Sequence, residues 1–393
     1  MAHAQNPDRT EVLIVGAGPT GLTLACDLAR RGVSALLVER APALFPGSRG
    51  KGLQPRTLEV FEDLGLLDAV HAAGRPYPRM MNWENGERQG EWDLVERAEP
   101  DPTVPFPAGW MLPQWRTQEL LYERLRELGG EVAFGTALSG LDQHPDRVEA
   151  RLTGPDGTGR TVAARYLVAA DGGRSTVRRA VGIPMTGEQV DPRPALVADV
   201  EIDGLDRENW HCWPKGPGGA LLLCPLPSTT AFQLFAQFGA DGGPETGGDP
   251  GEPDTSARGV RRTIAARTHL PESAVGAVHW ASGFRPRAAL ADRFREGRVF
   301  LAGDAAQSTP RPAARASTPA SRTRTTSAGS SARCCGTAPT RHCWTATSRS
   351  GCRSPPTCWR SPPGCTARAG SGPARCGAAR APSSSGSATR TAR

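Results

Sequence analysis

The tail of this 393-residue chain, from Ser308 to Arg393, lacks nearly every residue type from which a protein core is built. It contains no Leu, Val or Ile, and no Lys, Asp or Glu. A segment without large aliphatic side chains cannot bury enough apolar surface to fold, so the sequence predicts a disordered, low-complexity tail over residues 308–393.

Charge divides the chain at the same place. Of its 47 Lys and Arg residues, 14 are Arg of the tail, which leaves 33 basic residues and all 40 acidic residues in residues 1–307. The basic balance of the whole chain therefore comes from the tail. The folded part is acidic, and no nucleic-acid partner is expected for it.

Residues 1–307 are poor in cysteine and histidine. Their cysteines are isolated, at Cys26, Cys212 and Cys224, while the other seven of the ten lie in the tail. Their histidines stand singly as well, at His3, His71, His144, His211, His269 and His279. These spacings exclude a disulfide framework and a recognisable metal site, and they offer no Ser-His-Asp arrangement. No metal ligand and no catalytic side chain is assigned.

Long hydrophobic runs are also missing. No segment approaches the ~20 apolar residues of a membrane span. The first residues, "MAHAQNPDRTEVLIVGAG", contain no apolar signal core before the first expected strand. We therefore expect residues 1–307 to form a cytoplasmic enzyme with no membrane partner.

The most informative stretch that is present is "EVLIVGAGPTGLTLACDLARRGVSALLVER". The apolar run 12–15 predicts a buried parallel strand. It is followed by G-x-G-x-x-G, which consists of Gly16, Ala17, Gly18, Pro19, Thr20 and Gly21. Apolar residues at helical spacing then predict a helix that ends near Gly32, and "SALLVE" predicts a second strand ending at Glu39.

This spacing suits a dinucleotide. Gly16 permits a tight turn, Gly18 lets the backbone approach a pyrophosphate, and Gly21 lets the helix pack closely on the strand. The helix N-terminus offers free N–H groups to the phosphates, and the Glu39 carboxylate can bind ribose hydroxyls, which favours FAD or NAD over NADP. The alternative is a glycine turn in an unrelated α/β unit.

Three later stretches narrow the choice of dinucleotide. They are "GSRGKGLQPRTLEVFEDLGLLD" (47–68), "YLVAADGGRSTVRRAVGIPMTG" (166–187) and "GRVFLAGDAA" (297–306). In kind and order they resemble the FAD-dependent aromatic hydroxylases, the para-hydroxybenzoate hydroxylase-like flavoprotein monooxygenases, and especially the actinobacterial branch that acts on phenols and aromatic polyketides. The resemblance covers about residues 10–307.

The resemblance implies a set of FAD-contacting residues beyond the glycine loop and Glu39. Arg40 would lie near the adenosine, Arg49 beside the flavin, and Gln114 near the ribityl and phosphate groups. Asp171 and Gly172 match a fingerprint for FAD and NAD(P)H, and in Gly303-Asp304 the carboxylate would accept a hydrogen bond from a ribityl hydroxyl. Taken alone, Asp171-Gly172 is an ordinary turn and Arg49 a solvated loop charge.

The fold implied is α/β, a doubly wound, Rossmann-like FAD-binding domain with an inserted β-sheet substrate domain. The expected boundaries are 1–75, 111–184 and 281–307 for the FAD-binding domain, and 76–110 with 185–280 for the β-rich domain. Alternating patterns and turn signals predict strands in the second set. Five of its tryptophans (Trp83, Trp92, Trp110, Trp210 and Trp213) could wall a site for a flat phenol or simply fill a core.

The activity implied is aromatic hydroxylation. NADH or NADPH would reduce FAD, O2 would form a flavin C4a-hydroperoxide, and an electron-rich aromatic substrate would take up the distal oxygen. Two alternatives remain open. One is a non-hydroxylating flavin oxidoreductase on the same scaffold, and the other is a non-catalytic product that keeps only the nucleotide fold.

The tail departs from the family pattern, in which Gly-Asp-Ala-Ala leads into a glycine-rich helix start. When "AARASTPASRTRTTSAGSS" (313–331) is written in GC-rich codons and read with one extra base, it becomes "GGQGLNTGIQDAYNLGWKL". We therefore interpret residues after about 307 as out of frame because of a single-base deletion near codon 307. This chain would then lack the third flavin motif. The alternative is a genuine basic tail that binds nucleic acid or an acidic surface.

Overall fold

A computed structural model describes residues 8–94, 100–189, 193–238 and 252–308, all within one compact unit that spans Met1–Cys352. The predicted disordered or out-of-frame tail lies outside the described residues, apart from Ser308.

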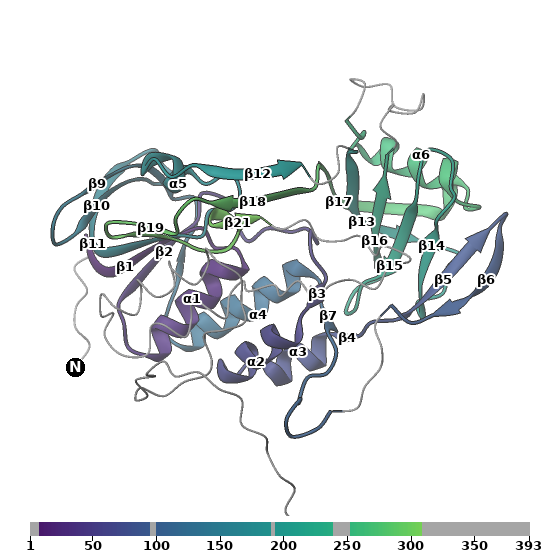
Figure 1. The fold of residues 1–393 in the computed structure, drawn as a ribbon, viewed down its shortest axis with the longest axis horizontal. Coiled ribbons are helices and arrows are strands. Elements are labelled where there is room, and N and C mark those ends of the chain that lie inside the picture. Colours follow the sequence, from purple (N-terminus) through teal and green to yellow (C-terminus); the bar gives the residue numbers. More distant parts are fainter. Residues whose placement is uncertain (1–7, 95–99, 190–192, 239–251, 309–393) are drawn as a thin grey trace, which may run out of the picture. The chain divides into compact units, whose positions relative to one another are not determined.

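An eight-stranded sheet carries the N-terminal motif (Figure 1). Its central strands are parallel: β1 (Arg9–Val15) pairs with β2 (Ala35–Val38) and β11 (Gly159–Ala169), β2 with β8 (Val132–Ala133), and β11 with β20 (Val299–Leu301). The antiparallel strands are β9 (Ala137–Gln143), β10 (Val148–Thr153) and β19 (Arg295–Glu296). The carboxyl ends of β1, β11 and β20 therefore share one edge of the sheet.

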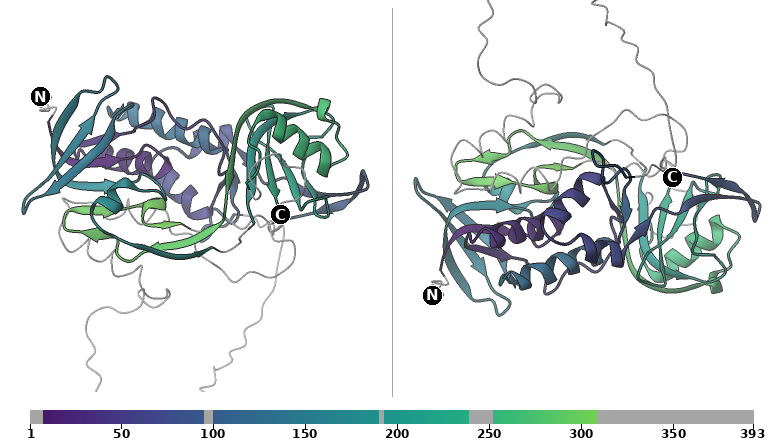
Figure 2. Two further views of the ribbon diagram at one scale, coloured as in Figure 1. Left: turned by 90° about the horizontal axis from the view of Figure 1, so that it is seen from above. Right: turned by 90° about the horizontal axis from the view of Figure 1, so that it is seen from below.

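Helices cover this sheet because β1 is apolar on both faces. Ile14 packs under α1 (Pro19–Arg30) and α4 (Gln114–Glu127), while Leu13 belongs to the core on the opposite face. The two helices lie next to each other in both orientations (Figures 1 and 2). The same core takes in α2 (Pro55–Asp63) and α3 (Leu67–Ala73).

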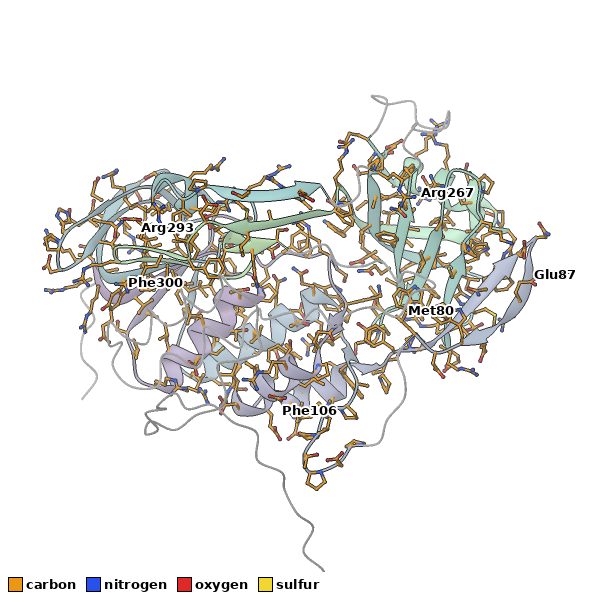
Figure 3. The ribbon with its side chains drawn as sticks, in the orientation of Figure 1. Met80, Glu87, Phe106, Arg267, Arg293 and Phe300 are labelled. Atoms are coloured by element: carbon orange, nitrogen blue, oxygen red, sulfur yellow. The ribbon has the colours of Figure 1, made fainter. Side chains whose placement is uncertain are left out.

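A seven-stranded sheet forms the second large layer. Its order is β17 (Val275–Phe284), β13 (Ala195–Ile202), β16 (Ala231–Gln237), β15 (Leu221–Pro225), β14 (Asn209–Trp213), β5 (Arg79–Glu84) and β6 (Glu87–Trp92). One face packs against α6 (Ala257–Arg267) through Val260 and Ile264. Figure 3 labels Arg267 at the end of α6. Its guanidinium donates to the Gln237 carbonyl oxygen at 2.7 Å.

Two small three-stranded sheets and three short helices complete the described fold. The sheets are β12 (Met185–Gln189) with β18 (Arg287–Ala291) and β21 (Gln307–Ser308), and β3 (Gly52–Leu53) with β7 (Trp110–Met111) and β4 (Arg75–Pro76). The short helices are α5 (Thr176–Ala180), η1 (Glu272–Ala274) and η2 (Gly303–Ala305).

The expectation of an α/β fold with a separate β-rich layer is confirmed in class. The expected domain boundaries stay a prediction. Among the described helices, none combines the length and the apolar character that a membrane crossing requires.

Candidate functional site

Two glycines of the loop after β1 are required by contacts within the protein. Gly16 has a φ of +105°, and a Cβ there would lie 2.5 Å from the Ala170 carbonyl oxygen. A Cβ at Gly21 would lie 1.9 Å from the carbonyl oxygen of Gly16. Both positions therefore require glycine for the tight turn and for the close packing of α1 on β1.

Gly18 is different, because a Cβ built there meets no atom within 4 Å. Its φ of −70° and ψ of 177° are accessible to any residue. Gly18 is the N-cap of α1, where no side chain caps the helix, and Pro19 follows in the first turn. The loop thus leaves open space beside uncapped helix amides, an arrangement that fits a pyrophosphate.

Glu39 closes the loop from the end of β2. Its Oε2 accepts from the Ala17 N–H at 2.9 Å, and its Oε1 accepts from the Ala41 N–H at 2.9 Å. Each carboxylate oxygen keeps a lone pair, so the group can still accept hydrogen bonds from ribose hydroxyls. The neighbouring Arg40 side chain is exposed.

The segments after β11 and β20 reach the same edge. The Ala170 N–H donates to the Val15 carbonyl and the Ala302 N–H to the Ala169 carbonyl, each at 2.8 Å. Gly303 has a φ of +59°, and a Cβ there would lie 2.5 Å from Thr20 Oγ1. The predicted Gly303 is therefore next to the glycine loop, and the Asp304 side chain that follows is exposed.

Asp171 organises the start of α5. Its Oδ2 accepts from the Thr176 and Val177 amides at 2.7 and 3.2 Å. Its Oδ1 is buried and has no partner among the described residues. Gly172 follows with a φ of +81°, so glycine suits this turn. The unpartnered oxygen is one atom that a bound group could satisfy.

Arg178 was not singled out from the sequence. Its buried guanidinium donates to the Gly173 and Ala305 carbonyl oxygens, both at 3.1 Å, so it joins the loop after β11 to η2. The signal for it was weak. The sequence offered only Ser175, three residues earlier, as a possible helix cap. In the structure Ser175 caps α5 by accepting from the Arg178 N–H.

The segments that carry Arg49 and Gln114 are joined by a backbone hydrogen bond. The Gln114 N–H, at the first residue of α4, donates to the Gly50 carbonyl at 2.8 Å. The Arg49 side chain is exposed and lies over the Phe45 ring, 4.9 Å from its centroid. The loop that carries Arg49, residues 47–51, thus leads directly to the N-terminus of α4.

The same loop contacts the seven-stranded sheet through residues that the sequence did not point to. The Ser48 N–H donates to Asp199 Oδ2 at 2.9 Å, and Gln233 Nε2 donates to the Ser48 carbonyl oxygen. Burial raises the pKa of Asp199 from 3.8 to about 6, and hydrogen bonds from Ser48 and the positive charges of His279 and Lys51 oppose that rise only in part.

The residues present therefore fit FAD. The site offers open space and free amides at Gly18, a carboxylate at the end of β2, and converging loops after β11 and β20. Within the described ranges, no cluster of His, Cys, Asp or Glu could hold a metal ion. The assignment of individual residues to the cofactor stays a prediction.

Comparisons with known proteins support FAD as the cofactor. The family described as FAD binding domain matches residues 9–315. A flavin-dependent monooxygenase of Mycobacteroides abscessus is 40% identical over 301 residues, which cover 75% of this chain and 61% of that protein. Aklavinone 12-hydroxylase of Streptomyces purpurascens is 36% identical over 328 residues, covering 78% and 58%.

A solved structure is similar over most of the chain. The ternary complex of aklavinone-11 hydroxylase with FAD and aklavinone has a TM-score of 0.67 and 32% identity, covering 84% of this chain and 61% of that one. The fold is that of the aromatic hydroxylase structure, and the residues at the site fit FAD. The chain belongs to the FAD binding domain family, whose members include flavin-dependent monooxygenases, and it spans about three fifths of the length of these relatives.

Proposed function

We propose that this chain derives from an FAD-dependent monooxygenase that uses NADH or NADPH and O2 to hydroxylate a phenolic or polyketide-like aromatic substrate. The observation that carries the proposal is the meeting of the loops after β1, β11 and β20 around open space at Gly18. The names of the relatives, including 6-methylpretetramide 4-monooxygenase of Streptomyces rimosus, support a polycyclic aromatic substrate.

In this proposal the residues of the chain bind and orient. The amides at the start of α1 hold the pyrophosphate, Glu39 the adenosine ribose, and Asp304 a ribityl hydroxyl. Arg49 and Gln114 approach the flavin from the side of the seven-stranded sheet. Bound FAD supplies the redox chemistry that activates O2.

The sheet offers the substrate an apolar edge at Phe284 and the half-buried Phe235, beside the buried Val197 and Leu222. Val197, Phe235 and Leu222 pair in one register across β13, β16 and β15, on the face that turns away from α6. Phe284 is 40% exposed, and its ring centroid lies 6.3 Å from that of Phe235. Such a surface suits a flat ring, and exclusion of water there protects the activated oxygen.

The test is to purify the full chain with FAD and to record flavin absorbance and substrate-dependent uptake of labelled oxygen. We expect a yellow protein that incorporates one atom of 18O from 18O2 into a phenolic polyketide. Flavin reduction without oxygen transfer would favour the non-hydroxylating oxidoreductase. A colourless protein that takes up no FAD would favour the non-catalytic alternative.

We also propose that the chain after about residue 307 is translated out of frame, which would weaken FAD binding. The family match ends at residue 315, close to that point, and so supports the proposal. Resequencing of codons 305–315 from independent genomic DNA is the direct test. An extra base would make the tail a sequencing error, whereas the present bases would mean a frameshifted allele. If neither reading frame of the resequenced DNA encodes an unbroken family motif, the proposal is overturned.

A further inference from the structure

One row of side chains crosses the seven-stranded sheet on the face that turns away from α6. Asp199 on β13 pairs with Trp280 on β17 and with Gln233 on β16, and Gln233 pairs with Cys224 on β15. The pairing of His211 with Leu223 places Trp210 of β14 opposite Cys224. These residues therefore form one continuous row, here called the crossing row.

Residues 47–51 follow this row from one side to the other. A Cβ at Gly47 would lie 2.3 Å from the Trp280 indole, so the backbone rests directly on that ring. The backbone of Ser48 comes next, and then Lys51, whose Nζ donates to Gln233 Oε1 at 2.6 Å and lies 4.1 Å from the centroid of Trp210.

Ser48 is the point of attachment. It is completely buried, yet neither its N–H nor its carbonyl group belongs to a helix or strand. Asp199 accepts from the N–H and Gln233 donates to the carbonyl, so two sheet side chains replace the missing backbone partners. The flanking Gly47 and Gly50 add freedom that these contacts must restrain.

A carboxylate at position 199 lowers the stability of the folded protein. Its side chain is almost completely buried, and its Oδ1 has no partner among the described residues. A buried carboxylate loses its hydration, and an apolar residue would fit the sheet at lower cost. The hydrogen bonds that act on this carboxylate come from Ser48, and the one from the Ser48 N–H is 2.9 Å long.

We propose that Asp199 is a positioning residue that fixes loop 47–51 on the seven-stranded sheet, with Gln233 as the second attachment, and so holds Arg49 in place for the flavin. The assignment of Arg49 to the flavin rests on the proposed function, whereas the attachment of the loop does not. The negative charge matters because a hydrogen bond to a carboxylate is stronger than one to a neutral acceptor.

The experiment measures the hydrogen exchange of the peptide that contains Ser48, in the full chain without FAD. Asp199→Ala removes the acceptor and is expected to speed this exchange by about ten-fold. Asp199→Asn keeps an acceptor without charge, so an increase of about three- to five-fold is expected. Gln233→Ala should also speed exchange. Asp203→Asn, an exposed change just beyond the end of β13, is the matched control and should leave it unchanged.

A pH series separates positioning from simple packing. Lys51 on the loop and the imidazole of His279 on β17 are the groups whose positive charge acts on Asp199, that of His279 only when it is protonated, and His279 in turn lies 3.2 Å from Glu201. The hydrogen bonds from Ser48 lower the pKa of Asp199, so the ionised carboxylate holds the loop more tightly than the protonated one. After correction for intrinsic exchange, protection of the Ser48 peptide against local opening, in which Asp199 stays buried in the sheet, should therefore fall several-fold as the pH drops below about 6, opposite in sign to the change in global stability. Asp199→Asn should abolish that dependence, and Glu201→Gln should keep it.

Two results would overturn the proposal. One is exchange in Asp199→Ala within two-fold of the unsubstituted chain at pH 7.5, and the other is an unchanged pH profile in Asp199→Asn. If Asp199→Ala does not fold, Asp199→Asn and its pH profile decide. The outcome is independent of the cofactor: failure of the chain to take up FAD would count against the proposed function and leave the loop attachment standing.

Discussion

At the scale of the residue, Asp199 shows how a site can oppose stability. Its folded pKa of about 6 lies above the ordinary 3.8, so the native state binds a proton more tightly than the unfolded state. Stability therefore falls as the pH rises from about 4 to 6, and the full cost of the ionised group, roughly 3 kcal/mol, is present above pH 6. Groups with such shifts gather at functional sites.

The first prediction follows from that sign. Asp199→Asn removes the buried charge, so we expect the variant to unfold at a higher urea concentration than the unsubstituted chain at pH 7.5. Its free energy of unfolding should be larger by up to about 3 kcal/mol. The difference should vanish near pH 4. Asp203→Asn serves as the control and should show no gain. A variant that is less stable at pH 7.5 would contradict the argument and leave Asp199 a purely structural residue.

The second prediction separates two glycines of one loop. Gly21→Ala forces a Cβ against the Gly16 carbonyl and should destabilise the protein by about 1–3 kcal/mol. Gly18→Ala meets no atom within 4 Å and should leave the melting temperature equal or slightly higher, yet weaken FAD binding. Thermal unfolding without FAD and a fluorescence titration with FAD measure the two effects. Unchanged FAD affinity in Gly18→Ala would remove Gly18 from the cofactor site.

At the scale of the element, the sequence was most informative where the pattern is local. The apolar run 12–15 and the glycine spacing predicted β1 and α1, and β2 ends at Val38, one residue before the expected end at Glu39. The attachment of Ser48 to Asp199 could not be predicted in this way. It joins positions 151 residues apart and depends on the register of β13 within its sheet. Arg178 was missed for a similar reason, because its partner Ala305 lies 127 residues away.

The third prediction concerns the join between α5 and η2. Arg178→Met leaves the Gly173 and Ala305 carbonyl oxygens without this donor, and we expect a loss of about 2–4 kcal/mol in urea unfolding. Arg179→Met is the matched control one residue further on. That side chain is exposed, and the change should cost less than about 0.5 kcal/mol. Equal losses in the two variants would show that Arg178 does not hold these segments together.

At the scale of the whole molecule, the last described residues directly follow Asp304, which is part of the proposed cofactor site. The last described strand, β21, pairs with β18 directly after η2, which carries Asp304. The residues that follow, 309–393, contain no Leu, Val or Ile and lie outside the described residues. Leu290 of β18, opposite Gln307, is 39% exposed.

The fourth prediction compares the protein products of two genes that differ by one base. Restoring a base within codon 307 should yield a protein that purifies with close to one FAD per chain, because the recovered glycine-rich helix start supplies amides to the flavin. The present chain should carry clearly less than one. The ratio of flavin to protein absorbance measures both, and a chain that stops at Ser308 is the control for the tail. If all three proteins bind FAD equally well, the third motif is dispensable and residues 1–308 suffice for the cofactor. If only the restored chain is yellow, the function belongs to the restored reading frame.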